Sequence, residues 1–212
     1  MEKKYPTSKN WEALNAYKSK LELTQQQREI LFGGLLGDLS LRKIGKFSRL
    51  VLEQKNKDYL FHLYEIFKPF VRTPPKQRLQ KRLKTSESRT TWYFSTISHS
   101  AFDDYYDMYY PQGRKLLPSQ HLLNDQLTAQ GLAYWFMDDG SKHATGYTFS
   151  TACFSIQEHN ILLDVLATKF DLTCNLHGSK YKSIYVPARN QANKKFKQLV
   201  QPFLVESMKY KL

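Results

Sequence analysis

The chain has 212 residues, 41% of them hydrophobic and 14% aromatic, which is enough apolar surface for a packed core and argues against wholesale disorder. Its 32 Lys and Arg outnumber 19 Asp and Glu, and the net charge of +13 predicts a polyanion partner, usually nucleic acid. No stretch approaches about 18 consecutive apolar residues, so we expect no integral membrane protein. Two cysteines, Cys153 and Cys174, exclude a disulfide scaffold or a four-cysteine zinc site.

In chain order, residues 1–24 predict a basic arm or short helix, with no apolar stretch that would serve as a secretion signal. An apolar helix ending at Asp38 comes next, followed by a hairpin over 39–54 with a basic tip. The pattern then predicts a helix over Asp58–Phe70, a hairpin over 76–97, a helix over 99–110 and a closing Lys115-Leu116 pair.

The second half repeats this order after a boundary near Pro118. Its apolar helix ends at Asp139, which is 101 positions after Asp38, and Lys211-Leu212 matches the earlier pair. The other predicted elements are a hairpin over 144–155, a helix over Gln157–Phe170, a hairpin over 173–187 and a helix over 189–200. We therefore predict an α+β fold made of two similar αββαββα halves, 25–118 and 119–212, each with an antiparallel sheet and packed through the two apolar helices.

The positive charge is concentrated in the first part of the chain. Residues 1–118 hold 22 Lys and Arg against 12 Asp and Glu, a net +10, whereas residues 119–212 hold 10 against 7, a net +3. The densest stretch, 72–89, carries strand-like spacing, and a ribbon with one basic face fits the major groove of DNA. A solvated surface ribbon is the alternative interpretation of such a charge run.

Asp38 and Asp139 stand at helix C-termini, where the helix dipole disfavours a carboxylate. Glycines at positions 33 and 37 permit the close approach of another helix, which would bring the two aspartates together. A divalent cation would relieve their repulsion, and hard oxygen ligands completed by water suit Mg²⁺. Capped or solvated aspartates are the alternative.

The two apolar segments resemble the motif of the LAGLIDADG homing endonucleases. Leu132, Ala133, Asp139 and Gly140 match its first, second, eighth and ninth positions, whereas Leu31, Gly33 and Asp38 match the first, third and eighth. Both copies lack the internal Asp of the motif. Two copies about 100 residues apart are typical of the monomeric, two-motif branch, and the chain is similar to its omega-intron-encoded type.

The resemblance implies a site-specific double-strand DNA endonuclease. The two motif helices would form the interface between the halves, with two sheets in successive major grooves. Asp38 and Asp139 would bind Mg²⁺ or Mn²⁺, with Ca²⁺ as a substitute that does not support cleavage, and the carbonyls of Gly37 and Asp138 would face the metals. Lys115 and Lys211 would be the basic residue of each site. Cutting across the minor groove would leave 3′ overhangs and 5′-phosphates.

The family often places a polar residue on the first hairpin, and here this position is Glu53 or Gln54 in the first half and Ala152 in the second, so the two sites are expected to differ. The further residues that we expect to contact DNA are basic, aromatic or polar side chains of the hairpins. They are Arg42, Lys43, Lys46, Arg49, Arg78, Lys81, Arg82, Lys84, Arg89, Trp92, Lys142, His143, Tyr147, Lys180, Tyr181 and Lys182.

Two other functions remain open at this point. A maturase of the same fold would bind its own intron RNA and assist splicing, and a catalytically inactive relative would only bind DNA. Without a transit peptide in the sequence, we expect an organellar matrix (chloroplast or mitochondrion) or a prokaryotic cytoplasm.

Overall fold

A computed structural model describes residues 11–81, 88–179 and 182–212. The chain forms two compact units. We call Met1–Arg28 with Ser40–Asp107 the first unit and Glu29–Leu39 with Met108–Leu212 the second unit. In the described part of the chain, no helix has the length and apolar character to cross a membrane.

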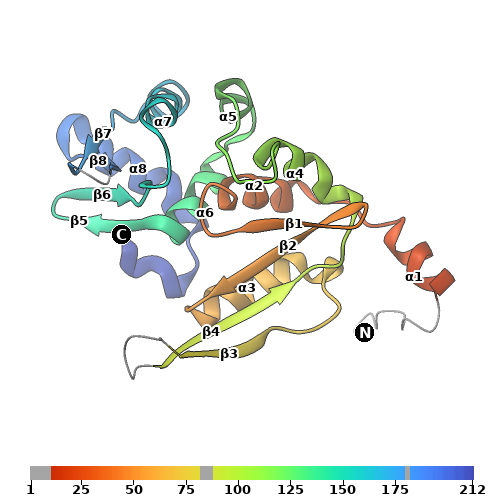
Figure 1. The fold of residues 1–212 in the computed structure, drawn as a ribbon. Helices are drawn as coiled ribbons and strands as arrows, with labels where there is room; N and C mark the ends of the chain where they lie inside the picture. The colour runs from red at the N-terminus through yellow and green to blue at the C-terminus, as the bar shows by residue number, and fades with distance from the viewer. Residues whose placement is uncertain (1–10, 82–87, 180–181) are drawn as a thin grey trace. The chain divides into compact units, whose positions relative to one another are not determined.

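The first unit is a four-stranded antiparallel sheet with one helix on its face. The strands are ordered β1-β2-β4-β3, and Figure 1 shows α3 across β2 and β4. Alternate residues of β2, among them Leu50 and Leu52, are buried, and Tyr64 of α3 packs edge-on against Phe94 of β4. The elements are α1 (Trp11–Lys18), β1 (Ser40–Ile44), β2 (Phe47–Gln54), α3 (Lys57–Phe67), β3 (Lys76–Lys81) and β4 (Ser88–Ser95).

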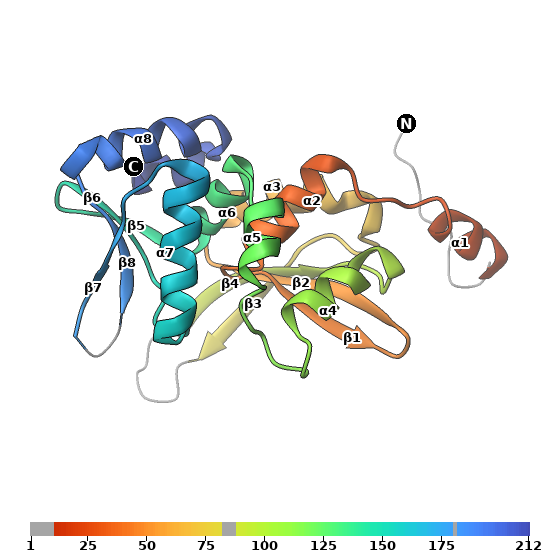
Figure 2. The ribbon, with the colours of Figure 1, turned by 90° about the horizontal axis from the view of Figure 1, so that it is seen from above.

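The second unit contains the other antiparallel sheet, ordered β5-β6-β8-β7. Phe136 of α6, Phe149 of β6 and Phe196 of α8 meet with ring centroids 4.9 to 5.6 Å apart, so α6 and α8 share one face of the sheet (Figure 2). Helices α5 and α7 lie side by side. The elements are α5 (Gln120–Gln126), α6 (Ala129–Asp139), β5 (Gly140–His143), β6 (Gly146–Phe149), α7 (Ile156–Phe170), β7 (Asn175–His177), β8 (Ser183–Val186) and α8 (Ala192–Val200).

Two helices connect the units in sequence. Helix α2 (Gln25–Gly34) begins in the first unit and continues into the second, and α4 (Asp103–Tyr109) does the same. The start of α2 is fixed by a reciprocal cap, because Thr24 Oγ1 accepts the Gln27 N–H while Gln27 Oε1 accepts the Thr24 N–H. Single 3₁₀ turns precede α4 at Ser100–Phe102 and α8 at Arg189–Gln191.

The α+β class and the repeated order of helices and antiparallel hairpins are confirmed. One predicted range was wrong, and one helix was missed. The hairpin expected over 144–155 starts at Gly140 and ends at Phe149, with its turn at Ala144 and Thr145. Gly146, which falls inside the predicted range, lies in β6, where a Cβ would come 2.1 Å from the Val186 carbonyl oxygen. Helix α5 was not predicted.

Candidate active site

The two motif segments pack backbone to backbone inside the second unit. A Cβ added to Gly33 would lie 2.0 Å from the carbonyl oxygen of Gly131, so only glycine permits this approach. Four residues later, a Cβ on Gly37 would meet the Cβ of Asp138 at 2.6 Å. The predicted close approach at Gly33 and Gly37 is therefore present, and it brings the two segment ends together.

The two segments end differently. Helix α6 continues regularly to Asp139, whereas α2 stops at Gly34 and the chain then tightens into turns with i to i+3 hydrogen bonds before Asp38. The Asp38 N–H, one of the donors beyond the helix, is accepted by Asp138 Oδ2 at 3.2 Å. A side chain of one motif thus holds the backbone of the other beside the candidate carboxylates.

Asp139 is a carboxylate in an electrostatically unfavourable position. Its pKa is raised to about 6, chiefly by burial and also by the negative charge of Asp38, while Lys115 and Lys211 act in the opposite direction. Asp139 is half-buried and Asp38 is exposed. The two carboxylates are therefore close enough to repel each other, as the sequence argument required, and a bound cation would favour their charged forms.

Lys115 and Lys211 occupy corresponding positions around the two aspartates. Lys115 Nζ donates to the carbonyls of Gly37 and Leu39, at 2.6 and 2.9 Å. Lys211 Nζ donates to the carbonyls of Met137 and, at 3.1 Å, Asp138. Burial lowers the pKa of both ammonium groups, and the nearby aspartates oppose that shift. Each lysine thus contacts the carbonyl immediately before its aspartate.

These residues surround a hollow of about 950 Å³ within the second unit. Asp38, Asp139 and Lys115 line it, and Ser150, whose N–H donates to the Asp139 carbonyl, lies on its wall with Ala152. Ala152 lies beyond β6, which ends at Phe149, and adds an apolar side chain to this wall. Cys153 is exposed and also lines this hollow.

The donor set fits a hard divalent cation completed by water. Within the described ranges, no group of three or more His, Cys, Asp or Glu side chains gathers as a metal cluster. The oxygens available are the carboxylates of Asp38 and Asp139 and the carbonyls of Gly37 and Asp138, which are ligands that Mg²⁺ accepts alongside several waters.

A basic face on the first sheet forms a second candidate region. Strand alternation and register place Arg42, Arg49, Glu53, Arg78 and Arg89 on the face of this sheet that points away from α3, which we call the distal face. Lys76, Gln80, Thr91 and Tyr93 share it, although the sequence argument had not selected them. Of these residues, only Glu53 carries negative charge.

Three of the residues expected to contact DNA from the first sheet lie on the α3 side instead. Trp92 packs edge-on against Phe61 at 5.6 Å, with Lys57 Nζ 4.9 Å from its ring centroid. Gln54 is the register partner of Trp92 and shares its face. Lys43 lies over Tyr106 and approaches Asp107 at 4.0 Å. Residue type alone did not distinguish the two faces.

A hollow of about 440 Å³ at the distal face is lined by Lys18, Arg49, Arg72 and Lys76, with no acidic residue among its lining. The Nε of Arg49 is buried and lacks a hydrogen-bond partner among the described residues. An oxyanion such as a backbone phosphate would satisfy it. Lys46 lies at the β1–β2 tip, where its ammonium is 5.6 Å from the Phe47 ring centroid.

The second sheet presents a different chemistry. His143, His177 and Tyr185 form a ring cluster on its face away from α8, with centroids 5.4 to 5.9 Å apart. Of these, only His143 was selected from sequence. Among the described residues of its strands, this face carries no Lys or Arg, which matches the smaller net charge of the second half.

Tyr147 requires a correction, because it is 7% exposed and packs between Phe136 and Phe196 in the core. Lys142 donates to the Leu212 carbonyl at 3.1 Å, and Lys182 to the Gly178 carbonyl at 2.7 Å. The candidates Arg82, Lys84, Lys180 and Tyr181 lie outside the described residues, and Lys81 is described only as the last residue of β3.

Glycine-packed helices that each deliver one aspartate, together with two four-stranded antiparallel sheets, define a two-motif LAGLIDADG protein. The chain belongs to the LAGLIDADG DNA endonuclease family, whose model matches residues 28–196. It is 33% identical over 200 residues to "Probable intron-encoded endonuclease 1" of Wickerhamomyces canadensis, covering 90% of this chain and 85% of that one.

Two further similarities concern a solved structure and a protein named as a maturase. The structure of the homing endonuclease I-WcaI bound to its DNA recognition sequence matches with a TM-score of 0.90 at 31% identity, over 97% of this chain and 94% of that one. The cytochrome b mRNA maturase bI2 of Debaryomyces hansenii is 28% identical over 90% of this chain and 74% of its own.

Proposed function

We propose that the protein is a site-specific double-strand DNA endonuclease of the homing type, encoded in an intron. The observation that carries this proposal is the pair of aspartates in the second unit, each with a lysine on its preceding carbonyl. The relationship to I-WcaI and to the W. canadensis protein supports DNA as the substrate. An inactive DNA-binding relative would have no need of both aspartates and both lysines.

Asp38 and Asp139 hold a divalent cation, Mg²⁺ or Mn²⁺, with Ca²⁺ as a substitute that does not support cleavage. When bound, the cation would make a water more acidic and stabilise negative charge on the scissile phosphate. Each aspartate serves one strand, where it would orient the attacking water by accepting its hydrogen bond. Lys115 and Lys211 place fixed positive charge beside the carboxylates, where negative charge accumulates as the phosphate is attacked.

The basic distal face of the first sheet binds the duplex in its major groove, with Arg42, Arg49, Arg78 and Arg89 as its cationic groups. The second sheet contributes neutral polar and imidazole groups, so its affinity for phosphate is weaker. Cleavage of both strands across the minor groove leaves 3′ overhangs and 5′-phosphates. The protein works as a monomer in an organellar matrix or a prokaryotic cytoplasm.

The test is cleavage of a plasmid that carries the intron-less allele of the host locus, in Mg²⁺ and in EDTA. Double-strand cleavage in Mg²⁺ alone is expected. Asp38→Asn and Asp139→Asn should each abolish it while duplex binding survives, and Asp125→Asn, which removes an exposed carboxylate elsewhere in the second unit, should cleave normally. Intact plasmid from the unmodified protein would overturn the proposal.

A maturase activity is the second candidate, because the D. hansenii relative carries that name. The two functions are distinguished by binding the intron RNA and the duplex in parallel. Tight binding of the intron RNA together with an uncut plasmid would favour the maturase, whereas both activities together would indicate a bifunctional protein.

A further inference from the structure

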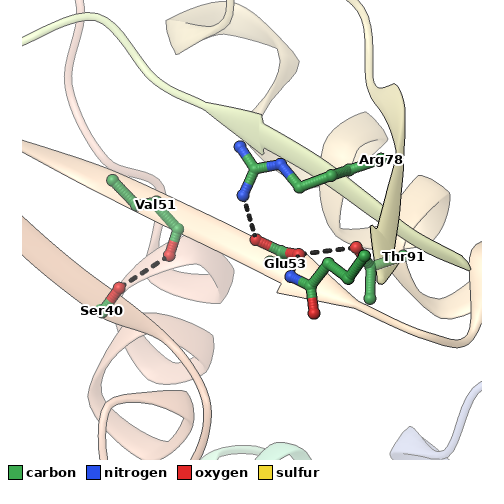
Figure 3. Close-up of polar contacts among 6 residues, drawn as sticks. Ser40, Val51, Glu53, Arg78 and Thr91 are labelled. Carbon is green, nitrogen blue, oxygen red and sulfur yellow. Dashed lines mark hydrogen bonds and ion pairs between the residues drawn. The ribbon is translucent and has the colours of Figure 1, made fainter. Parts of the chain in front are cut away.

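The distal face of the first sheet contains an acidic residue at the centre of a cationic surface. Glu53 lies on β2, and its carboxylate accepts hydrogen bonds from three side chains: Arg78 Nη1 at 2.9 Å, Gln80 Nε2 at 2.7 Å and Thr91 Oγ1 at 2.6 Å. Figure 3 shows the Glu53 carboxylate between Arg78 and Thr91. The side chain of Glu53 is 30% exposed, so the cluster is partly shielded from solvent.

The three donors come from two other strands, so one carboxylate joins three strands of the sheet. Thr91 lies on β4, and Arg78 and Gln80 on β3, which pairs with β4 and not with β2. Arg78 is also held from a second side, because its guanidinium carbon lies 4.3 Å from the ring centroid of Tyr93. The guanidinium is therefore fixed in both position and plane.

A carboxylate in this position would weaken a surface that only binds phosphate. A carboxylate on a DNA-binding face cancels one cation and repels the backbone of the duplex. Base recognition has the opposite requirement, because an arginine reads guanine only when its planar group meets the base edge in a fixed orientation. Arg78 donates to Glu53 through one nitrogen, and a guanidinium has five N–H donors in total, so this bond uses only part of its donor capacity.

We propose that Glu53 is a positioning residue for sequence recognition, which holds Arg78 and Gln80 together as one reading unit on the distal face of the first sheet. Arg78 and Gln80 carry the side-chain types that pair with guanine and adenine, respectively. They are two residues apart on one strand, so they face the same groove and read neighbouring base pairs. This inference rests on the proposed binding of duplex DNA.

The experiment is selection of bound sequences from a randomised duplex library, in Ca²⁺ to prevent cutting, followed by equilibrium binding to the selected duplex and to its single-base-pair variants. For Glu53→Gln, discrimination should fall about 5- to 10-fold at one or two adjacent base pairs. Affinity for an unselected duplex should rise, because one negative charge is removed. Glu53→Asp keeps the charge but shortens the reach, so it should lose the same discrimination without that rise.

Glu65→Gln is the matched control, because Glu65 is an exposed acid on α3 of the same unit, paired with Lys68 and away from the distal face. It should leave the selected sequence unchanged. In a double-mutant cycle, Arg78→Ala should abolish the preference at the base pair that Arg78 reads, and adding Glu53→Gln to it should change nothing further at that base pair. Thermal denaturation of each variant verifies that the fold is retained.

Two outcomes would overturn the inference: an unchanged base preference in both Glu53 variants, or an effect of Glu53→Gln that persists in full without Arg78. If Glu53→Gln fails to fold, the Glu53→Asp and Arg78→Ala selections decide between the same outcomes. A library from which the unmodified protein selects no sequence would instead count against the proposed function, so the two failures are distinguishable.

Discussion

Replacing Gly33 by alanine tests whether the contact between the motif helices sets the geometry of the active site. The new Cβ would lie 2.0 Å from the Gly131 carbonyl oxygen, whereas real Cβ contacts essentially never fall below 3.0 Å, so the two backbones must separate by at least 1.0 Å. Overpacking of this kind costs about 1–3 kcal/mol. The expected cost lies at the upper end because the obstacle is backbone, and the better helix propensity of alanine offsets about 1 kcal/mol.

The expected net loss of stability is therefore about 2 kcal/mol, which lowers the melting temperature by about 4–8 °C for a chain of this size. Cleavage should fall by about 100-fold, because a displacement of about 1 Å is enough to misplace reacting groups. The control is Gly34→Ala on the same helix, where the Cβ would meet Leu39 Cδ2 at 2.7 Å, the end of a side chain that can move. Calorimetry and plasmid cleavage measure the two effects, and the reasoning is refuted if Gly33→Ala is as stable and active as Gly34→Ala.

Three other predictions concern the lysines, the α7 cap and salt. Lys115→Met and Lys211→Met should each slow one strand, so that nicked plasmid accumulates on gels; equal slowing of both strands would contradict separate sites. Ser155 and Glu158 cap the start of α7, because the Glu158 carboxylate accepts the Ser155 N–H and Ser155 Oγ accepts the Glu158 N–H. Burial raises the pKa of Glu158, but hydrogen bonds from Ser155 and Leu117 outweigh it, so the net shift is downward. Glu158→Gln should therefore lose up to about 1 kcal/mol above the ordinary glutamate pKa, and the difference should vanish as the pH falls through the lowered value, as urea titrations would reveal. Duplex affinity should fall steeply with salt, and a flat binding curve would exclude extensive phosphate contact.

Most of what the sequence could predict followed from its internal repeat. Similar spacing, about 100 positions in each case, related Asp38 to Asp139 and Lys115 to Lys211, because a duplicated fold places equivalent positions in equivalent surroundings. The structure brings all four into one unit, although their catalytic roles stay predictions. The Asp138 side chain was not foreseen as a partner of the Asp38 N–H, since that contact depends on how closely two distant segments approach.

The face on which each strand residue lies was harder to predict. Trp92 and Tyr147 were selected because aromatic side chains often contact nucleic acid, yet both pack against helices. Alternation with Phe94 and Phe149 would have assigned them to the core, because residues two apart share a face. The hairpin predicted over 144–155 was misplaced because Gly146 permits a close backbone approach in β6, and a glycine of this kind looks identical to a turn glycine in sequence.

The carboxylate that joins three strands also affects how this protein could acquire a new target. Because Glu53, Arg78 and Gln80 depend on one another, a useful change in the recognition of the first sheet requires coordinated substitutions, and single changes leave a charge without its partner. On the second sheet, the described residues of the face away from α8 are neutral or imidazole side chains with no such ionic link, so they can change one at a time. Stepwise mutation should therefore change recognition by the second sheet first, whereas recognition by the first sheet should change only when several residues are substituted together.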